Sequence, residues 1–196
     1  MRQPLTPSAL NLLFTEARTH HAWIPEKISE ETLRQLYDLT KWGPTAVNAG
    51  PMRVLFLQSE AAKEKLYPAL MGSNVDQVRA APITAIIAYD ERFYEHLPRL
   101  FPHADVRGMF ESNAEARDST AFRNSSLQGA YLMIAARALG LDVGPMSGFD
   151  PAKVDETFFQ GTFWKSNFLC NLGYGDDSKL FPRGERLSFE EACRIL

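Results

Sequence analysis

A short run of hydrogen-bond donors follows the first predicted helix of the chain. It comprises Arg18, Thr19, His20 and His21, with the aromatic Trp23 close behind. A guanidinium, a hydroxyl and an imidazole are side chains that bind a phosphate group well. The same run also fits a solvated helix end, where cations lie near the negative end of the helix dipole. Both interpretations, an anion site and a plain helix terminus, remain open from these residues.

The stretch Gly144-Pro145-Met146-Ser147-Gly148 is a second candidate. Its glycine and proline content predicts irregular backbone, and the two glycines allow the backbone to pass close to another group. One interpretation is a tight turn between a helix and a strand. The other is that the backbone amides of this loop face a planar ligand.

The loop from Pro44 to Pro51 is a third candidate, because it combines two prolines with the polar Thr45 and Asn48. Ligand contacts are often made by such loops, in which rigid and polar residues occur together. Turn formation alone also accounts for Asn48.

The sequence lacks the motifs that are typical of several classes of enzyme. The spacing around Ser147 is not that of a nucleophile elbow, and all four histidines precede this serine. No His-Glu-x-x-His or Cys-x-x-Cys pattern predicts a metal, and no Walker loop is present. Gly173-x-Gly175 is a poor dinucleotide fingerprint, because Ser178 stands where the third glycine belongs. An enzyme without such groups often uses an organic cofactor that the protein positions.

The elements around these candidates predict an α+β sandwich, a small mixed sheet flanked by helices, and not a doubly wound sheet. A central helix before Gly140 has an apolar face containing Leu127, Tyr131 and Ile134, and Gly140 fits a left-handed cap. Strands are expected at 54–58, 82–89 and 168–174, the second buried on both faces. Further helices are expected at 8–21, 29–41, 60–70, 75–80, 150–159 and 188–196.

The pattern breaks between Asp90 and Asp118, where aromatic residues are mixed with arginines and histidines. Two interpretations have equal weight: a helical lid over a site, and a satellite cluster packed on a neighbouring element or chain.

Length and composition indicate one domain of 196 residues, with 45% hydrophobic residues and a net charge of −3. The charge gives no sign of nucleic-acid binding. Two cysteines, Cys170 and Cys193, do not suggest a disulfide framework, and no apolar run predicts a signal peptide or a membrane span. We therefore expect a cytoplasmic protein.

Five segments in order along the chain give it a family resemblance. They are Phe14-Thr-Glu-Ala-Arg-Thr-His, Lys41-Trp-Gly-Pro-Thr, Ala121-Phe-Arg-Asn-Ser-Ser-Leu-Gln, Gly144-Pro-Met-Ser-Gly-Phe-Asp and Gly173-Tyr-Gly-Asp-Asp-Ser-Lys-Leu-Phe. With these segments the chain resembles the FMN-dependent nitroreductases over nearly its whole length. Within them it is most similar to the malonic-semialdehyde reductases of the pyrimidine-utilisation (Rut) pathway.

The resemblance implies an intertwined homodimer with two FMN sites, each built from both chains. Phosphate binding is implied for Arg18, Thr19 and Arg186, with Lys179 and Arg183 as helpers. His20 and His21 remain candidate donors to the same phosphate from the run of residues 18–21. Ribityl contacts are implied for Asn74 and Gln77, ring contacts for Gln128, and contacts from the partner chain for Pro44, Thr45 and Asn48. Residues 145–148 (Pro145, Met146, Ser147 and Gly148) would lie against the flavin, with a backbone N–H near Ser147 and Gly148 donating to its N5.

The implied activity is ping-pong hydride transfer from NADH or NADPH through FMN to a small-molecule acceptor. For malonic semialdehyde the product is 3-hydroxypropanoate, and the candidate cations for its carboxylate are Arg107, Arg117 and Arg123. Gly50 and Met52 replace the Gln and Trp of the common family motif, and Ala17 and His21 stand where further cations are frequent. Reduction of nitroaromatics or quinones, non-catalytic flavin binding and a flavin-free dimerisation domain are the alternatives.

Overall fold

The computed structural model describes residues 3–196, which fold around one five-stranded sheet in the order β1-β5-β3-β2, with β4 beside β5. The strands are β1 (Trp23–Ile24), β2 (Met52–Leu57), β3 (Ile83–Asp90), β4 (Asp142–Met146) and β5 (Trp164–Gly175). All of these strand pairs are antiparallel, and an isolated parallel bridge joins Thr19 to Val143. The expected small sheet flanked by helices is confirmed.

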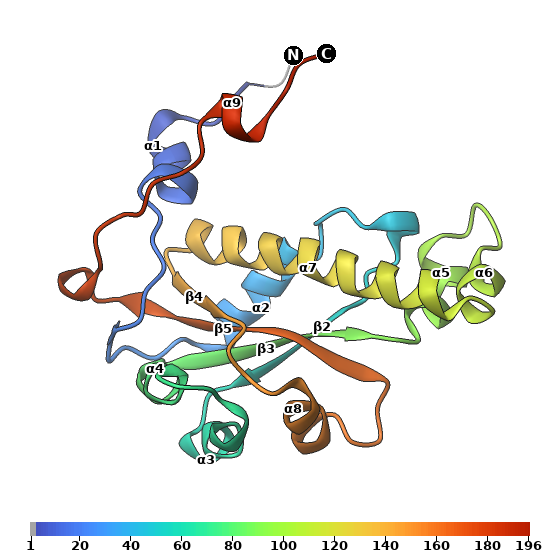
Figure 1. The fold of residues 1–196 in the computed structure, drawn as a ribbon, viewed down its shortest axis with the longest axis horizontal. Helices are drawn as coiled ribbons and strands as arrows, with labels where there is room; N and C mark the ends of the chain where they lie inside the picture. Colours follow the sequence, from blue (N-terminus) through green and yellow to red (C-terminus); the bar gives the residue numbers. More distant parts are fainter. Residues whose placement is uncertain (1–2) are drawn as a thin grey trace.

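Helices cover both faces of the sheet (Figure 1). On one face lie α2 (Glu30–Thr40) and the long α7 (Ala114–Ala138). On the other lie α3 (Glu60–Glu64), α4 (Asn74–Ala80) and α8 (Pro151–Phe158). One apolar cluster fills each of the two layers. The central strand β3 is therefore buried on both sides, as its apolar sequence predicts.

The segments near the two ends of the described chain form an arm beyond the C-terminal end of α7, with which the arm is in contact (Figure 1). The arm contains α1 (Pro7–Leu10) with the π-helical turn η1 (Asn11–Thr15), and α9 (Phe189–Ala192) with its capping box of Ser188 and Glu191. The helix expected over 8–21 thus ends at Thr15. Residues 17–20 are extended instead, because their backbone groups bond to β4 and to the C-terminal segment.

The predicted apolar face of α7 is wrong for the protomer. Leu127 and Tyr131 are 47% and 41% exposed, whereas Gln128, Gly129 and Leu132 face the sheet. A Cβ at Gly129 would lie 2.5 Å from the ring of Phe168, so close packing on the sheet requires a small residue there. Phe122, Leu127 and Tyr131 of α7 are exposed, whereas Leu132 is buried in the core.

Residues 90–118 form a packed satellite cluster at the first end of α7. The segment contains η4 (Phe93–His96), α5 (Leu97–Leu100) and α6 (Arg107–Glu111). Phe93, Leu97 and Phe110 are buried there against Ala49 and Ala121. The sequence left open why this segment is rich in aromatic residues, and their packing in this cluster explains it.

Candidate functional site

Four arginines surround a cavity of about 640 Å³ between the start of the chain and its C-terminal segment. They are Arg18, Arg137, Arg183 and Arg186, and Thr19 and His21 also line the cavity. The residues that line it within the described part of the chain include no carboxylate. The structure thus brings Arg18, Thr19 and His21 together with Arg183 and Arg186, which lie more than 160 residues further along the sequence. Such a concentration of guanidinium groups favours a phosphate or another anion.

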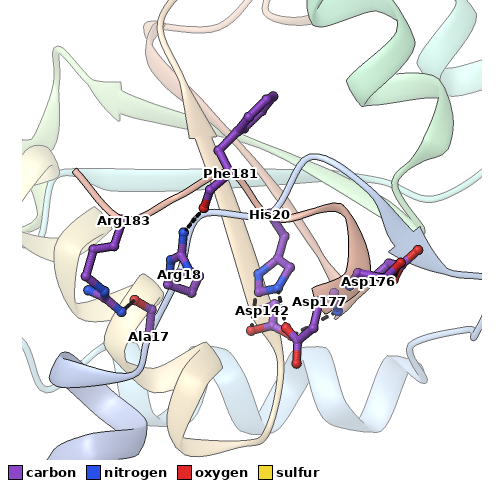
Figure 2. Close-up of polar contacts among 10 residues, drawn as sticks. Ala17, Arg18, His20, Asp142, Asp176, Asp177, Phe181 and Arg183 are labelled. Carbon is purple, nitrogen blue, oxygen red and sulfur yellow. Dashed lines mark hydrogen bonds and ion pairs between the residues drawn. The ribbon is translucent and has the colours of Figure 1, made fainter.

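Reciprocal contacts hold the two segments together (Figure 2). The guanidinium of Arg18 donates to the carbonyl of Phe181, and that of Arg183 donates to the carbonyl of Ala17 at 3.0 Å. The N–H of Asp176 also donates to the carbonyl of Ala22 at 3.0 Å. These bonds orient the arginines without neutralising them, because each acceptor is an uncharged carbonyl.

Glycine at position 144 lets the N-terminal segment lie directly on β4. The N–H of His20 donates to the carbonyl of Val143 at 3.1 Å. A Cβ added at Gly144 would meet the carbonyl oxygen of His20 at 2.5 Å, which no real structure tolerates. The first glycine of the 144–148 stretch therefore serves the close approach of two backbones.

A chain of contacts leads from the arginine cavity to residues 145–148. His21 Nδ1 lies 3.0 Å from Gln77 Oε1, and Asn74, three residues earlier on α4, donates to the carbonyl of Gly148 at 2.8 Å. A Cβ at Gly148 would lie 2.5 Å from Asn74 Nδ2, so this position also needs glycine. The predicted contacts Asn74 and Gln77 thus lie between the cavity and the loop.

The 144–148 stretch is more regular than its composition predicts. Gly144, Pro145 and Met146 belong to β4, where Pro145 pairs with Cys170 and Met146 with Leu169. Proline is accepted in this strand because, apart from the single bridge between Val143 and Thr19, β5 is the one strand that pairs with β4 within residues 3–196, so no ladder partner on the open side needs an N–H from Pro145. The backbone N–H groups of Ser147 and Gly148 have no acceptor within residues 3–196. Two free donors on a half-exposed loop are available to a ligand.

Three predicted site residues are turned elsewhere. Gln128 is buried, and its side-chain oxygen accepts the N–H of Met52 at 3.0 Å. This hydrogen bond joins α7 to β2 within the core. His20 is 3% exposed and lies between Asp142 and Asp177, away from the arginine cavity. Lys179 ends η5 (Asp177–Lys179) on the surface and does not line the cavity. None of these three side chains lines the arginine cavity of its own chain.

The 44–51 loop lies at the other end of the molecule. Its turn η2 (Ala46–Asn48) contacts α5, whereas the arm with α1 and α9 lies beyond the opposite end of α7 (Figure 1). Asn48 donates to the carbonyl of Leu100 at 2.8 Å, and Thr45 accepts the N–H of Gly50 at 3.1 Å. Val47 and Asn48 have φ values of 46° and 51°, a strained conformation for a β-branched residue. Pro44, Thr45 and Asn48 are therefore not brought to the arginine cavity of their own protomer.

The candidate substrate arginines differ in their pairing. Arg107 lies 3.4 Å from Glu111, and Arg117 donates to Asp118 at 2.7 Å, a contact that raises the pKa of Arg117. Arg123 is exposed on α7 and has no carboxylate partner within residues 3–196. Of the three, Arg123 is the one whose charge is available.

Arg137, in the last turn of α7, lines the cavity and was not among the site residues expected from the sequence. Its Nη1 donates to the carbonyl of Leu13 at 3.2 Å, and its buried Nε has no partner within residues 3–196. A cation in the last turn of a helix was the available signal, but that position alone does not reveal a neighbour 124 residues away.

Nucleophilic and metal chemistry are not indicated by the geometry. Burial raises the pKa of the Cys170 thiol to about 12, so this group is not a thiolate at neutral pH. Residues 3–196 contain no group of three or more His, Cys, Asp or Glu side chains placed to hold a metal. None of the helices formed by these residues combines the length and apolar character needed to cross a bilayer.

The chain is similar to known proteins both in sequence and in fold. The sequence pattern of the nitroreductase family matches residues 15–174. Among solved structures, a protein from Exiguobacterium sibiricum described as a nitroreductase, in complex with FMN, has 23% identity and a TM-score of 0.86, covering 100% of both chains. A protein from Staphylococcus epidermidis described as an NAD(P)H:FMN oxidoreductase has 20% identity and a TM-score of 0.85, also covering 100% of both. An enone reductase of gut-bacterial fatty-acid saturation has 18% identity and a TM-score of 0.85, covering 98% of this chain and 100% of its own. At these identities the structures show a shared fold.

Proposed function

Because the chain belongs to the nitroreductase family, we propose that it is an FMN-dependent NAD(P)H oxidoreductase. One observation carries the proposal: four arginines around one cavity are linked through His21, Gln77 and Asn74 to a loop with two free backbone donors. A dianionic phosphate at one end and a polar planar ring at the other match this arrangement. The FMN complex of the Exiguobacterium protein of the same fold supports it.

In this proposal, different residues bind the phosphate, the ribityl chain and the ring of FMN. Arg18, Arg183 and Arg186 would bind the phosphate, with Thr19 and Arg137 adding donors. Asn74 and Gln77 stand where the ribityl chain would run. The N–H groups of Ser147 and Gly148 would donate to the ring without supplying a competing acid. When bound, FMN supplies two-electron chemistry, taking a hydride from NADH or NADPH and delivering it to an acceptor.

The proposed active form is a homodimer, because the protomer leaves large apolar side chains uncovered. Phe122, Leu127 and Tyr131 are 41–53% exposed on α7, and the arm exposes Leu10, Phe14, Leu187 and Phe189. Large apolar side chains exposed in such number support a protein interface on this helix and arm. A second copy of this chain that covers these apolar side chains would also bring its Pro44, Thr45 and Asn48 to the arginine cavity of the first copy. These three residues do not reach the cavity of their own chain.

We expect Leu127→Glu to convert the dimer to a monomer and to abolish FMN retention, since a charge in an apolar interface costs several kcal/mol at most sites. The matched control is Ala152→Glu, at an exposed position on α8 across the sheet. Light scattering coupled to size exclusion gives the mass, and absorbance gives the flavin content. A dimeric Leu127→Glu variant with full flavin would refute this interface.

For the physiological acceptor we propose malonic semialdehyde, reduced to 3-hydroxypropanoate. The aldehyde carbon gains a hydride equivalent that originates from NAD(P)H, and the oxygen gains a proton from water. The substrate carboxylate needs a cation, and Arg123 is exposed without a carboxylate partner among the described residues. The resemblance of the five sequence segments to those of malonic-semialdehyde reductases supports this choice.

The acceptor is tested with the FMN-loaded protein at steady state, with NADH or NADPH and either malonic semialdehyde, a nitroaromatic or a quinone. The proposal expects 3-hydroxypropanoate by chromatography, and an Arg123→Gln variant with a higher KM for the aldehyde but not for the quinone. Arg34→Gln, an exposed arginine on α2, is the control. Turnover of the nitroaromatic or quinone without turnover of the aldehyde would make the protein a broad-specificity reductase.

A further inference from the structure

A buried histidine joins the two segments that carry the arginine cavity. His20 is 3% exposed, its Nε2 lies 3.1 Å from Asp177 Oδ1, and its Nδ1 lies 3.4 Å from Asp142 Oδ1 (Figure 2). Neither carboxylate is a neighbour of His20 in sequence. The imidazole therefore sits between β4 and the turn that leads to the C-terminal arginines.

The surroundings are shaped around this ring. A Cβ at Gly175 would lie 2.1 Å from the imidazole of His20, so the backbone of β5 packs flat against it. The N–H of Gly175 donates to Asp142 Oδ2 at 2.9 Å, which leaves Oδ1 toward the histidine. The second glycine of the Gly173-x-Gly175 motif thus serves His20 and not a dinucleotide.

The position of Asp177 matters for the cavity. Asp177 begins η5, and the chain then runs through Phe181 to Arg183 and Arg186. The carbonyl of Phe181 receives the bond from Arg18, and Arg183 returns a bond to Ala17. A contact between His20 and Asp177 fixes the near end of this segment while those bonds fix its middle.

The protonation state of His20 decides how many of its contacts form. A neutral imidazole has one N–H and one lone pair, whereas an imidazolium donates from both nitrogens. Both nitrogens of His20 face carboxylate oxygens, and Nδ1 makes no hydrogen bond within residues 3–196. A neutral ring therefore serves only one of the two carboxylates. The charged or titratable groups around it are Glu16, Arg18, Arg137, Asp142, Asp176 and Asp177.

We propose that His20 is a positioning residue for the arginine cavity: in its doubly protonated form it ties Asp142 to Asp177 and holds Arg183 and Arg186 beside Arg18. The inference rests on the proposed function, because FMN is the anion whose binding reports on the cavity. It adds a residue that does not line the cavity and acts through another segment. It also makes FMN affinity depend on pH through a group outside the binding site.

The test uses Asp177→Asn, because Asp177 is exposed and its loss leaves the core intact. Kd values for FMN and for riboflavin are measured by fluorescence at about pH 6 and about pH 8.5, on either side of the usual range of imidazole. We expect the variant to bind FMN about three- to fivefold more weakly than wild type at the lower pH, the size of a partly exposed ion pair. At the higher pH the difference shrinks, and riboflavin affinity is unchanged at both.

Asp105→Asn, which removes a charge from the distant 90–118 segment, is the control and should match wild type at every pH. All three proteins share every other group and are measured with the same FMN, so any further effect of pH is common to them and cancels in the comparison. An equal loss for FMN and riboflavin, a loss independent of pH, or no loss would overturn the role of His20. A wild-type chain that binds neither flavin would overturn the proposed function as well, which separates the two failures.

Discussion

Replacing Arg18 with alanine should raise the Kd for FMN by about 30- to 100-fold, the equivalent of about 2–3 kcal/mol for a charge-assisted contact with phosphate. Arg18 lines the cavity and also donates to the carbonyl of Phe181. Its loss therefore removes a cation and loosens the segment that carries Arg183 and Arg186. Equilibrium dialysis against FMN measures the effect directly.

Arg34→Ala is the matched control, because Arg34 is an exposed arginine on α2 paired with Glu30. It should bind FMN as wild type does. Arg186→Ala should resemble Arg18→Ala, since both arginines line the same cavity. Full flavin occupancy in either cavity variant would show that the phosphate does not bind there.

Gly144→Ala should lower the free energy of unfolding by about 2–3 kcal/mol, as an overpacked contact does. The added Cβ meets the backbone oxygen of His20 at 2.5 Å and the ring of Trp23 at 3.3 Å. A backbone oxygen cannot swing aside like a side chain, so β4 and residues 18–20 must separate. FMN binding should weaken together with stability, because Arg18 and Thr19 lie on the displaced segment.

Gly108→Ala provides the comparison, since a Cβ at Gly108 on α6 meets nothing within 4 Å. Urea denaturation of both variants gives the difference in stability, and that of Gly108→Ala should be within error of wild type or slightly higher. A stable Gly144→Ala variant with normal FMN affinity would mean that the close approach to His20 has no role.

Local signals were sufficient for many of the elements. The helices expected from residues 29 and 150 are present, with Ser29 as the N-cap of α2 and Asp150 as the N-cap of α8. Gly140 has a φ of 77° after α7, as its expected left-handed cap requires. The helix expected over 60–70 is split, because Pro68 has no N–H to continue α3 and instead lies in the first turn of η3 (Tyr67–Ala69). The helix expected over 188–196 ends at Ala192.

Failures occurred where long-range contacts override periodicity. The apolar repeat through Ala17 predicts helix, yet Ala17 and His20 bond to Arg183 and Val143, which requires extended backbone. On α7 the largest apolar residues face outward, because the inner face needs Gly129 to reach the sheet. A rule that places large apolar residues inside therefore fails for Phe122, Leu127 and Tyr131 of this helix.

The site divides in the same way. The convergence of Arg18 with Arg183 and Arg186 agrees with the resemblance to a known family. The directions in which the side chains of Gln128 and His20 point could not be predicted from the sequence. Gln128 and His20 are polar residues near ligand-binding segments, but both are buried and bond within the protein. A single sequence gives the type of a side chain and its neighbours in the chain, and not the partner that satisfies it in the fold.

The most direct test of the central claim is an anaerobic titration of the FMN-loaded protein with NADH and, separately, NADPH, followed by visible absorbance. The account predicts that the oxidised flavin band bleaches with at least one nucleotide and returns when malonic semialdehyde is added, with one 3-hydroxypropanoate formed per flavin. A bound flavin that stays yellow with both nucleotides would contradict it and would leave a flavin-binding protein without reductase activity.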